Sequence, residues 1–183
     1  DGAASLSQSG NIIGTLSGFT AGAGLSLFDA ASLTVSGAVT PGTGGIVLKT
    51  IGAGHNLTIN GPIGSAAHGM TLTSAGTISE GSSGVINTVL LTGSSAGLVT
   101  LNGANNIANL AAFSSGNGLL LNDAQSLTVS GAVTTGAGAL VLSTTGAGHN
   151  MTVNAAIGST AHSVKLTSAG YITPSGSGII NAL

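Results

Sequence analysis

The side chains that could carry acid–base chemistry are few in this sequence. Its acidic residues are Asp1, Asp29, Glu80 and Asp123. A glycosidase or lyase needs at least two carboxylates close together, often with a metal or a basic residue. These four acids do not form a cluster, and the sequence has no arginine. We therefore expect no catalytic residue, and we expect Asp29 and Asp123 to lie at turns or strand ends and to be replaceable by Asn.

Histidines are the only other reactive side chains, and they occur at His55, His68, His149 and His162. Their neighbours include Gly54, Asn56 and Gly69, which predict solvated corners, where Asn or Gln would also be tolerated. A zinc site built on His55 and His68 would need a third ligand, which the Asp, Glu and Cys placement does not supply. The sequence also has no nucleophile elbow for a reactive serine and no glycine-rich calcium nonapeptide. We expect no metal and no cofactor.

Outward-pointing hydroxyl and amide side chains form a further candidate site. We expect one polar ladder along one face, made by Thr34, Ser36, Thr58, Asn60, Thr77, Ser79, Thr128, Ser130, Thr152 and Asn154. Thr is a β-favouring residue that keeps a surface soluble, so a ladder of this kind needs no ligand. A flat hydroxyl array could also bind ice or glycans. The second members vary between Ser and Asn, and only Tyr171 could stack on a sugar, so neither ligand is favoured.

The composition excludes several classes of protein. Charged residues make up only 3 % and aromatic residues 2 %, whereas hydrophobic residues make up 42 % and the net charge is −2. Disordered chains combine low hydrophobicity with high net charge, so this chain is expected to fold. Two lysines cannot neutralise many phosphates, which excludes nucleic acid as a partner. No apolar run is long enough for a membrane span, and without cysteine there is no disulfide scaffold.

A long internal repeat organises the whole sequence. SLTVSGAVT at residues 32–40 recurs at 126–134, and GAGHN at 52–56 recurs at 146–150, each at an offset of 126 − 32 = 94 positions. Shorter segments of about 21 to 28 residues begin at Gly24, Gly45, Gly69 and Leu90, a length typical of solenoid coils. We divide this single segment, residues 1–183, into a partial repeat (1–23), a first repeat (24–117) and a partial second repeat (118–183).

Period-two alternation of apolar residues predicts strands with one buried face. Pairs such as Leu33 and Val35, or Leu57 and Ile59, should point inward, and the Gly, Asn and Ser clusters between the runs are turn chemistry. The fold class is therefore all-β, a right-handed parallel β-helix (β-solenoid) of about eight coils. We predict four coils in each 94-residue repeat, so that equivalent residues lie on the same face, about 19 Å apart.

The phrases SLTVSGAV, NLTINGPIGS and GMTLTSAGTI resemble the coils of filamentous haemagglutinin-like large exoproteins. These are the adhesins that Gram-negative bacteria secrete by the two-partner route. The resemblance covers essentially the whole chain and rests on the pattern L-T-V/I-x-G-x-I followed by an apolar-alternating strand. It implies an extracellular, rod-like β-helix used for attachment or matrix formation at the cell surface.

These observations favour a structural role over an enzymatic one. We expect a rod or fibre segment of a bacterial surface adhesin, whose partners are adjoining repeats, a second copy stacked head to tail, or host or matrix glycans. A ligand-binding β-solenoid that uses the polar ladder on ice or carbohydrate is the alternative. A β-helix enzyme that degrades polysaccharides is the least favoured, because a carboxylate cluster and arginine are missing.

Overall fold

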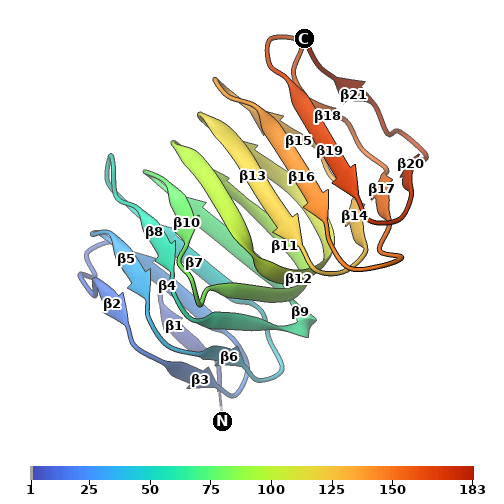
Figure 1. Ribbon diagram of the computed structural model, residues 1–183. Coiled ribbons are helices and arrows are strands. Elements are labelled where there is room, and N and C mark those ends of the chain that lie inside the picture. Colours follow the sequence, from blue (N-terminus) through green and yellow to red (C-terminus); the bar gives the residue numbers. More distant parts are fainter. Residues whose placement is uncertain (1) are drawn as a thin grey trace.

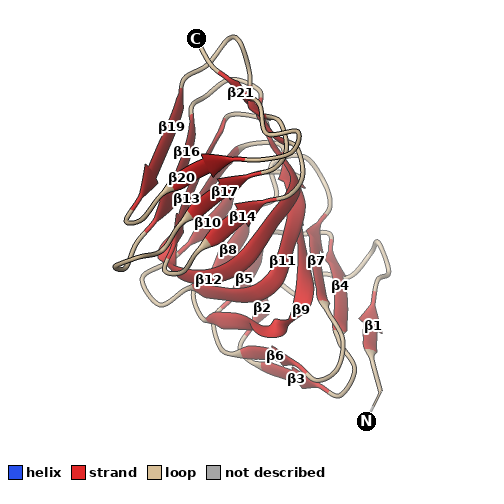
Figure 2. Cartoon of the chain, turned by 90° about the vertical axis from the view of Figure 1, so that its right-hand side faces the viewer, coloured by secondary structure: helices blue, strands red, loops and turns tan. Residues whose placement is uncertain are grey.

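The computed structural model describes residues 2–183, and over this range it contains strands and no helix. The strands are parallel and stack as a β-solenoid of about eight turns, with the two termini at opposite ends (Figure 1). Figure 2 shows loops and turns joining the strands at the corners of the stack. The predicted all-β solenoid is therefore confirmed.

Three walls of strands enclose the core. Wall A starts with β1 (Ala4–Leu6), β4 (Leu25–Asp29) and β7 (Ile46–Thr50), and continues with the C-terminal parts of β9 (Pro62–Ser74), β11 (Val85–Ser95) and β12 (Leu98–Ser115). Wall B contains β2 (Thr15–Leu16), β5 (Leu33–Val35), β8 (Leu57–Ile59), β10 (Ile78–Glu80), the first residues of β12, β13 (Gly118–Asp123), β16 (Leu140–Thr144) and β19 (Val164–Ser168).

Wall C is the shortest of the three. It contains β3 (Phe19–Ala21), β6 (Val39–Pro41), the N-terminal parts of β9 and β11, and the middle of β12. Above β12, a bend divides wall A into two series of strands. The first series consists of β14 (Leu127–Val129), β17 (Met151–Val153) and β20 (Ile172–Pro174). The second series consists of β15 (Val133–Thr135), β18 (Ile157–Gly158) and β21 (Ile180–Asn181).

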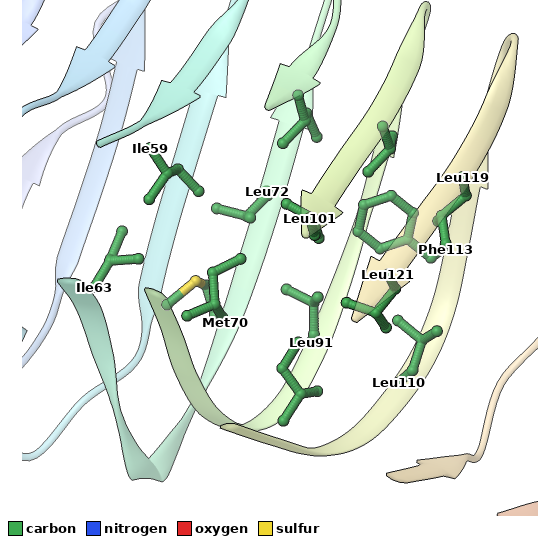
Figure 3. Packing of buried hydrophobic residues seen from close by; sticks show 14 of the residues in the cluster. Ile59, Ile63, Met70, Leu72, Leu91, Leu101, Leu110, Phe113, Leu119 and Leu121 are labelled. Atoms are coloured by element: carbon green, nitrogen blue, oxygen red, sulfur yellow. The ribbon is translucent and has the colours of Figure 1, made fainter. Parts of the chain in front are cut away.

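Apolar side chains form vertical rows inside the walls. Each inward residue lies on the inward residue of the turn below, as Leu57 lies on Leu33 and Ile78 lies on Leu57. One turn takes about 19 to 24 residues, so the alternation within a strand and the stacking between turns keep the same side chains inside. Figure 3 shows Ile59, Met70, Leu91, Leu110 and Phe113 pointing into this common core, where they are fully buried or nearly so.

The register corrects the prediction of four whole coils per repeat. Following wall B upward from Leu33, four turns lead to Leu119 and not to Leu127, its equivalent in the second repeat. The strand that contains Leu127 lies instead in wall A, where Val129 stacks on Leu110. Equivalent residues of the two repeats therefore lie on different walls.

The segment that begins at Leu90 causes this shift, because it makes more than one turn. It contributes Leu91 to wall A and Val99 to wall B, and then returns to wall A with Leu110. The 94-residue repeat consequently makes about four and a third turns, and it rotates each repeated feature by about a third of a turn.

Paired cysteines test this register in a chain that has no cysteine of its own. Thr100 and Leu120 are paired neighbours on wall B, and the Cα atoms of such neighbours lie about 4.8 Å apart, within disulfide reach. We expect the double variant Thr100→Cys, Leu120→Cys to oxidise readily. Thr92→Cys with Leu120→Cys is the pair that four whole coils would bring together, and rapid oxidation of that pair would contradict the register. Mass spectrometry of oxidised samples distinguishes the two.

A second prediction concerns the inward and outward positions of one strand. Leu57→Asn removes a fully buried side chain and places an unpaired amide in the core, so unfolding in urea should show a loss of about 2 to 5 kcal/mol. Thr58 points outward from the same strand and is half-buried, so Thr58→Asn should cost under about 1 kcal/mol. Equal losses from the two variants would show that the strand faces are assigned wrongly.

Candidate functional site

Part of the expected polar ladder forms a continuous row on wall B. Thr34, Thr58 and Ser79 are stacked partners in β5, β8 and β10, and the Ser79 hydroxyl donates to the Thr58 hydroxyl at 3.5 Å. Thr15 lies below this row and Thr100 above it. Next in the row come Leu120 and Val141, so the hydroxyls end there.

The ladder residues of the second repeat form a separate row. Thr128 and Thr152 are stacked with Thr173 in β14, β17 and β20. Asn109 lies directly below Thr128, which places this row on wall A and not above Thr34 and Thr58. The prediction of one ladder along one face is therefore wrong, because the repeat is rotated.

The remaining ladder residues lie at bends. Ser36, Asn60, Ser130 and Asn154 are exposed, and each follows its strand and donates its backbone N–H to a carbonyl of the turn below at 2.7 to 2.9 Å. Thr77 is a turn residue whose N–H and hydroxyl both donate to the side-chain oxygen of Asn56, at 2.8 and 3.0 Å. These five residues bind neighbouring turns and do not extend the hydroxyl rows.

Two of the acidic residues lie at strand ends, as predicted. Asp29 is the last residue of β4 and Asp123 the last residue of β13, and both are completely buried. Glu80 is half-buried, and Asp1 lies outside the described residues. Asp29 accepts N–H bonds from Ile13, Gly14 and Ala31 at 2.9 to 3.2 Å. Asn would weaken these bonds, so we now expect Asp29→Asn to lower the stability of the fold, whereas the sequence predicts that Asn is tolerated.

Glu80 and Asp123 are close to a common residue, although the sequence predicted no acidic cluster. The Asn105 side-chain N–H donates to Glu80 at 3.1 Å, and Asn105 is the register partner of Asp123. Burial raises the pKa of Asp123 to about 7, against the opposing effect of backbone N–H groups of Ile107 and Ala124. Burial also raises the pKa of Glu80, opposed by its bonds to Gly103 and Asn105.

The histidines bind the turns of the solenoid. His55 Nδ1 donates to the Ile51 carbonyl at 2.6 Å, and His149 Nδ1 donates to the Thr145 carbonyl at 2.7 Å in the second repeat. Gly52 has a positive φ of 99° and lies under the His55 ring, where a Cβ would come within 2.9 Å of it. In both histidines, Nδ1 is therefore already hydrogen-bonded to a backbone carbonyl of its own turn.

His68 and His162 have unrelated surroundings. His68 lies inside β9, at the bend where this strand passes from wall C to wall A, and its carbonyl accepts the hydroxyl of Thr88 at 2.7 Å. His162 Nε2 donates to the Gly136 carbonyl at 2.7 Å. Between residues 2 and 183, no group of three His, Cys, Asp or Glu side chains could hold a metal ion.

A row of buried polar side chains, which was not predicted from the sequence, lies at the ends of the long strands. In wall A this row, the first corner column, consists of Asp29, Thr50, Ser74, Ser95, Ser115 and Thr135. The Ser74 hydroxyl is within bonding distance of the carbonyls of His55 (2.9 Å) and Thr77 (2.8 Å), and accepts the Gly76 N–H at 3.2 Å. A buried turn leaves backbone groups without partners, and these hydroxyls satisfy them.

A second row of polar side chains of this kind lies on another wall. The second corner column consists of Asn105, Asp123, Thr144 and Ser168 in wall B. The signal was present in the sequence, because each long strand continues its alternation by one inward position, as in Leu25, Leu27 and Asp29. Polar residues are rarely buried, so their type alone does not indicate that this position points inward.

No helix among residues 2–183 has the length and apolar character required to cross a membrane. A hollow lined by Gly2, Ala4, Phe19, Thr20 and Gly22 opens at the N-terminal edge of the stack. These residues supply small and apolar side chains and one hydroxyl, which is a poor donor set for a metal or a charged ligand.

Comparison with known proteins gives no match. No protein-family model matches the chain, and no curated protein or solved structure matches it.

The corner columns predict a difference between two equivalent serines. Ser74→Ala would leave the buried Gly76 N–H without a partner and would remove one of the two hydrogen bonds of the Thr77 carbonyl, which keeps the Leu57 N–H at 2.9 Å, at a cost of about 1 to 3 kcal/mol. Ser168 makes the corresponding bonds to Gly170 and Tyr171, but both of these residues are exposed, so water replaces the hydroxyl and the loss should be smaller. Urea unfolding of both variants measures the difference, and equal losses would contradict the capping role.

Proposed function

We propose that the chain is a rigid structural segment of a rod or fibre in a bacterial surface adhesin. The observation that carries this proposal is the parallel stacking of about eight turns around one apolar core. Strands such as β4 and β5 are bonded both to the turn below and to the turn above, so the stack resists bending without a disulfide.

The surface composition supports a passive, extended body. Backbone groups on the sides of the stack are paired between turns, so solubility depends on polar groups of the outward side chains. Thr, Ser and Asn provide these polar groups in the rows on walls A and B. With charged residues at only 3 %, no outward patch is suited to a strongly charged partner.

The adhesin assignment rests on the resemblance of the coil phrases to filamentous haemagglutinin-like exoproteins. It carries with it a location outside the cell or on the outer surface of a Gram-negative bacterium. Long parallel β-solenoids suit that role, because adding turns lengthens the body by about 4.8 Å each without changing its cross-section.

The two ends of the stack provide the contacts for growth. The strands β2 and β3 at one end and β19 and β20 at the other have a partner on one side only. Such edges pair with further parallel strands, either adjoining turns of a longer chain or a second copy stacked head to tail. The contact is made by backbone hydrogen bonds and apolar side chains, not by ion pairs.

A ligand-binding function for the outward rows is the second candidate. It is favoured by the row of Thr15, Thr34, Thr58, Ser79 and Thr100, which repeats a hydroxyl on five successive turns. Ice or a neutral glycan would suit such a row. The row is interrupted at Leu120 and is not continued by Thr128, which limits its length.

Binding experiments separate these functions. The purified chain is tested on a glycan array, for thermal hysteresis and for turnover of acidic and neutral polysaccharides, beside the variant Thr58→Val, Ser79→Ala. The rod proposal expects no specific signal and no difference between the two proteins. Binding or hysteresis that the variant loses would replace it with the ligand-binding function, and reproducible turnover would establish an enzyme.

Head-to-tail assembly gives the positive test of the rod. We expect fibres in electron micrographs and a fibre-diffraction spacing near 4.8 Å along the fibre axis. Assembly should be nearly the same at low and high salt, because few charges are present to be screened. A strictly monomeric protein, or fibres that dissolve with rising salt, would contradict this mode of assembly.

A further inference from the structure

The same corner aspartate has different partners in the two repeats. Asp29 is bonded by Gly14 of the preceding partial repeat, which has a positive φ of 69° and donates its N–H to Oδ2 of Asp29 at 2.9 Å. Before Asp123 the equivalent of this glycine, 94 positions later, is Ala108, which lies within β12. Asp123 accepts the Ile107 N–H on Oδ1 at 3.0 Å, but its buried Oδ2 has no hydrogen-bond partner.

A second buried carboxyl with an unpaired oxygen lies below Asp123. Glu80 accepts N–H bonds on Oε2 from Gly103 at 2.8 Å and from Asn105 at 3.1 Å, whereas its Oε1 is buried without a partner. Asn105 lies between the two acids and is fully buried, with its side-chain oxygen accepting the Ile86 N–H at 2.7 Å. We call Glu80, Asn105 and Asp123 the acid stack.

We propose that the acid stack is a proton-binding site that makes the stability of the middle turns depend on pH. An ionised carboxylate leaves each unpaired oxygen charged and buried, which is unfavourable without a compensating donor or cation. A protonated carboxyl removes that charge. Asp29 is the equivalent residue in the first repeat, and both of its oxygens accept backbone N–H groups.

No cation faces the acid stack from the elements packed against it in residues 2–183. Below Asp123 lies Asn105, and above it lies Thr144, whose neighbour Thr145 donates its N–H to the Asp123 carbonyl at 2.8 Å. His149 follows Thr145 in the turn above, and its Nδ1 is bonded to the carbonyl of Thr145. Lys49 and Lys165 point outward, and Lys49 lies over the ring of Phe28.

The direction of the pH effect follows from the raised pKa values. Burial raises the pKa of Asp123 to about 7, above the ordinary value of 3.8, and burial also raises the pKa of Glu80. Between the ordinary pKa of Asp123 and its raised pKa of about 7, the folded chain binds more protons than the unfolded chain, so stability falls as pH rises. The contribution of Asp123 is complete below about pH 4 and is lost as the pH rises through 7.

Urea unfolding between pH 5 and 8.5 tests the proposal on the whole chain. For the native sequence, the unfolding equilibrium constant should increase by up to about tenfold per pH unit below pH 7, because one proton is released. Asp123→Asn should remove most of this slope, and Glu80→Gln should remove a smaller part. Asp29→Asn is the matched control, which should lower stability and leave the slope unchanged.

Two further measurements use the native chain, so they do not depend on the folding of a variant. Carboxyl ¹³C NMR of the native chain should show one buried aspartate that titrates near neutral pH. Stability at pH 8 should be the same with calcium and with a chelator. A native chain whose pH slope matches that of Asp123→Asn, or one that calcium stabilises at pH 8, would overturn the proposal, the second outcome in favour of a cation site.

Discussion

The structure depends on one constraint, the in-register parallel pairing of each turn with the next. Pairing places Leu57 on Leu33 and Ile78 on Leu57, so any side chain inside the stack must match the one above and below it. The same rule applies to polar residues, since Thr50 and Ser74 share a corner and bond each other at 3.2 Å. The interior is consequently built of vertical rows, mostly apolar on the walls and polar at the corners.

Much of the fold could be predicted because the alternation is local. The inward direction of Leu57 and Ile59 follows from period two alone, and the length of the segments indicates a solenoid. The number of turns per repeat could not be predicted in the same way. Inward Ile107, Leu110 and Phe113 are three positions apart, because the chain bends between them, and such spacing does not indicate where a wall ends.

The buried polar groups show a second limit of sequence reasoning. Extending the alternation by one position predicts that Asp29 and Asp123 both point inward. Their different partners depend on residues elsewhere in the chain, namely Gly14 with its positive φ and Ala108 in a strand. Hydrogen bonding depends on the three-dimensional structure, so two aspartates at equivalent repeat positions can differ in whether both carboxylate oxygens have a partner.

The rotation of the repeat also limits what the surface can do. A ligand that needs a long, regular row must find the same residue on every turn of one wall. Thr34 and Thr58 belong to wall B, whereas their equivalents Thr128 and Thr152 belong to wall A, so each wall presents only a short hydroxyl row. If the 94-residue unit recurs in tandem, each short row reappears about a third of a turn further round the axis. Such an array presents similar surfaces in three directions, which suits a body that projects or links more than one that binds a flat ligand along a single face.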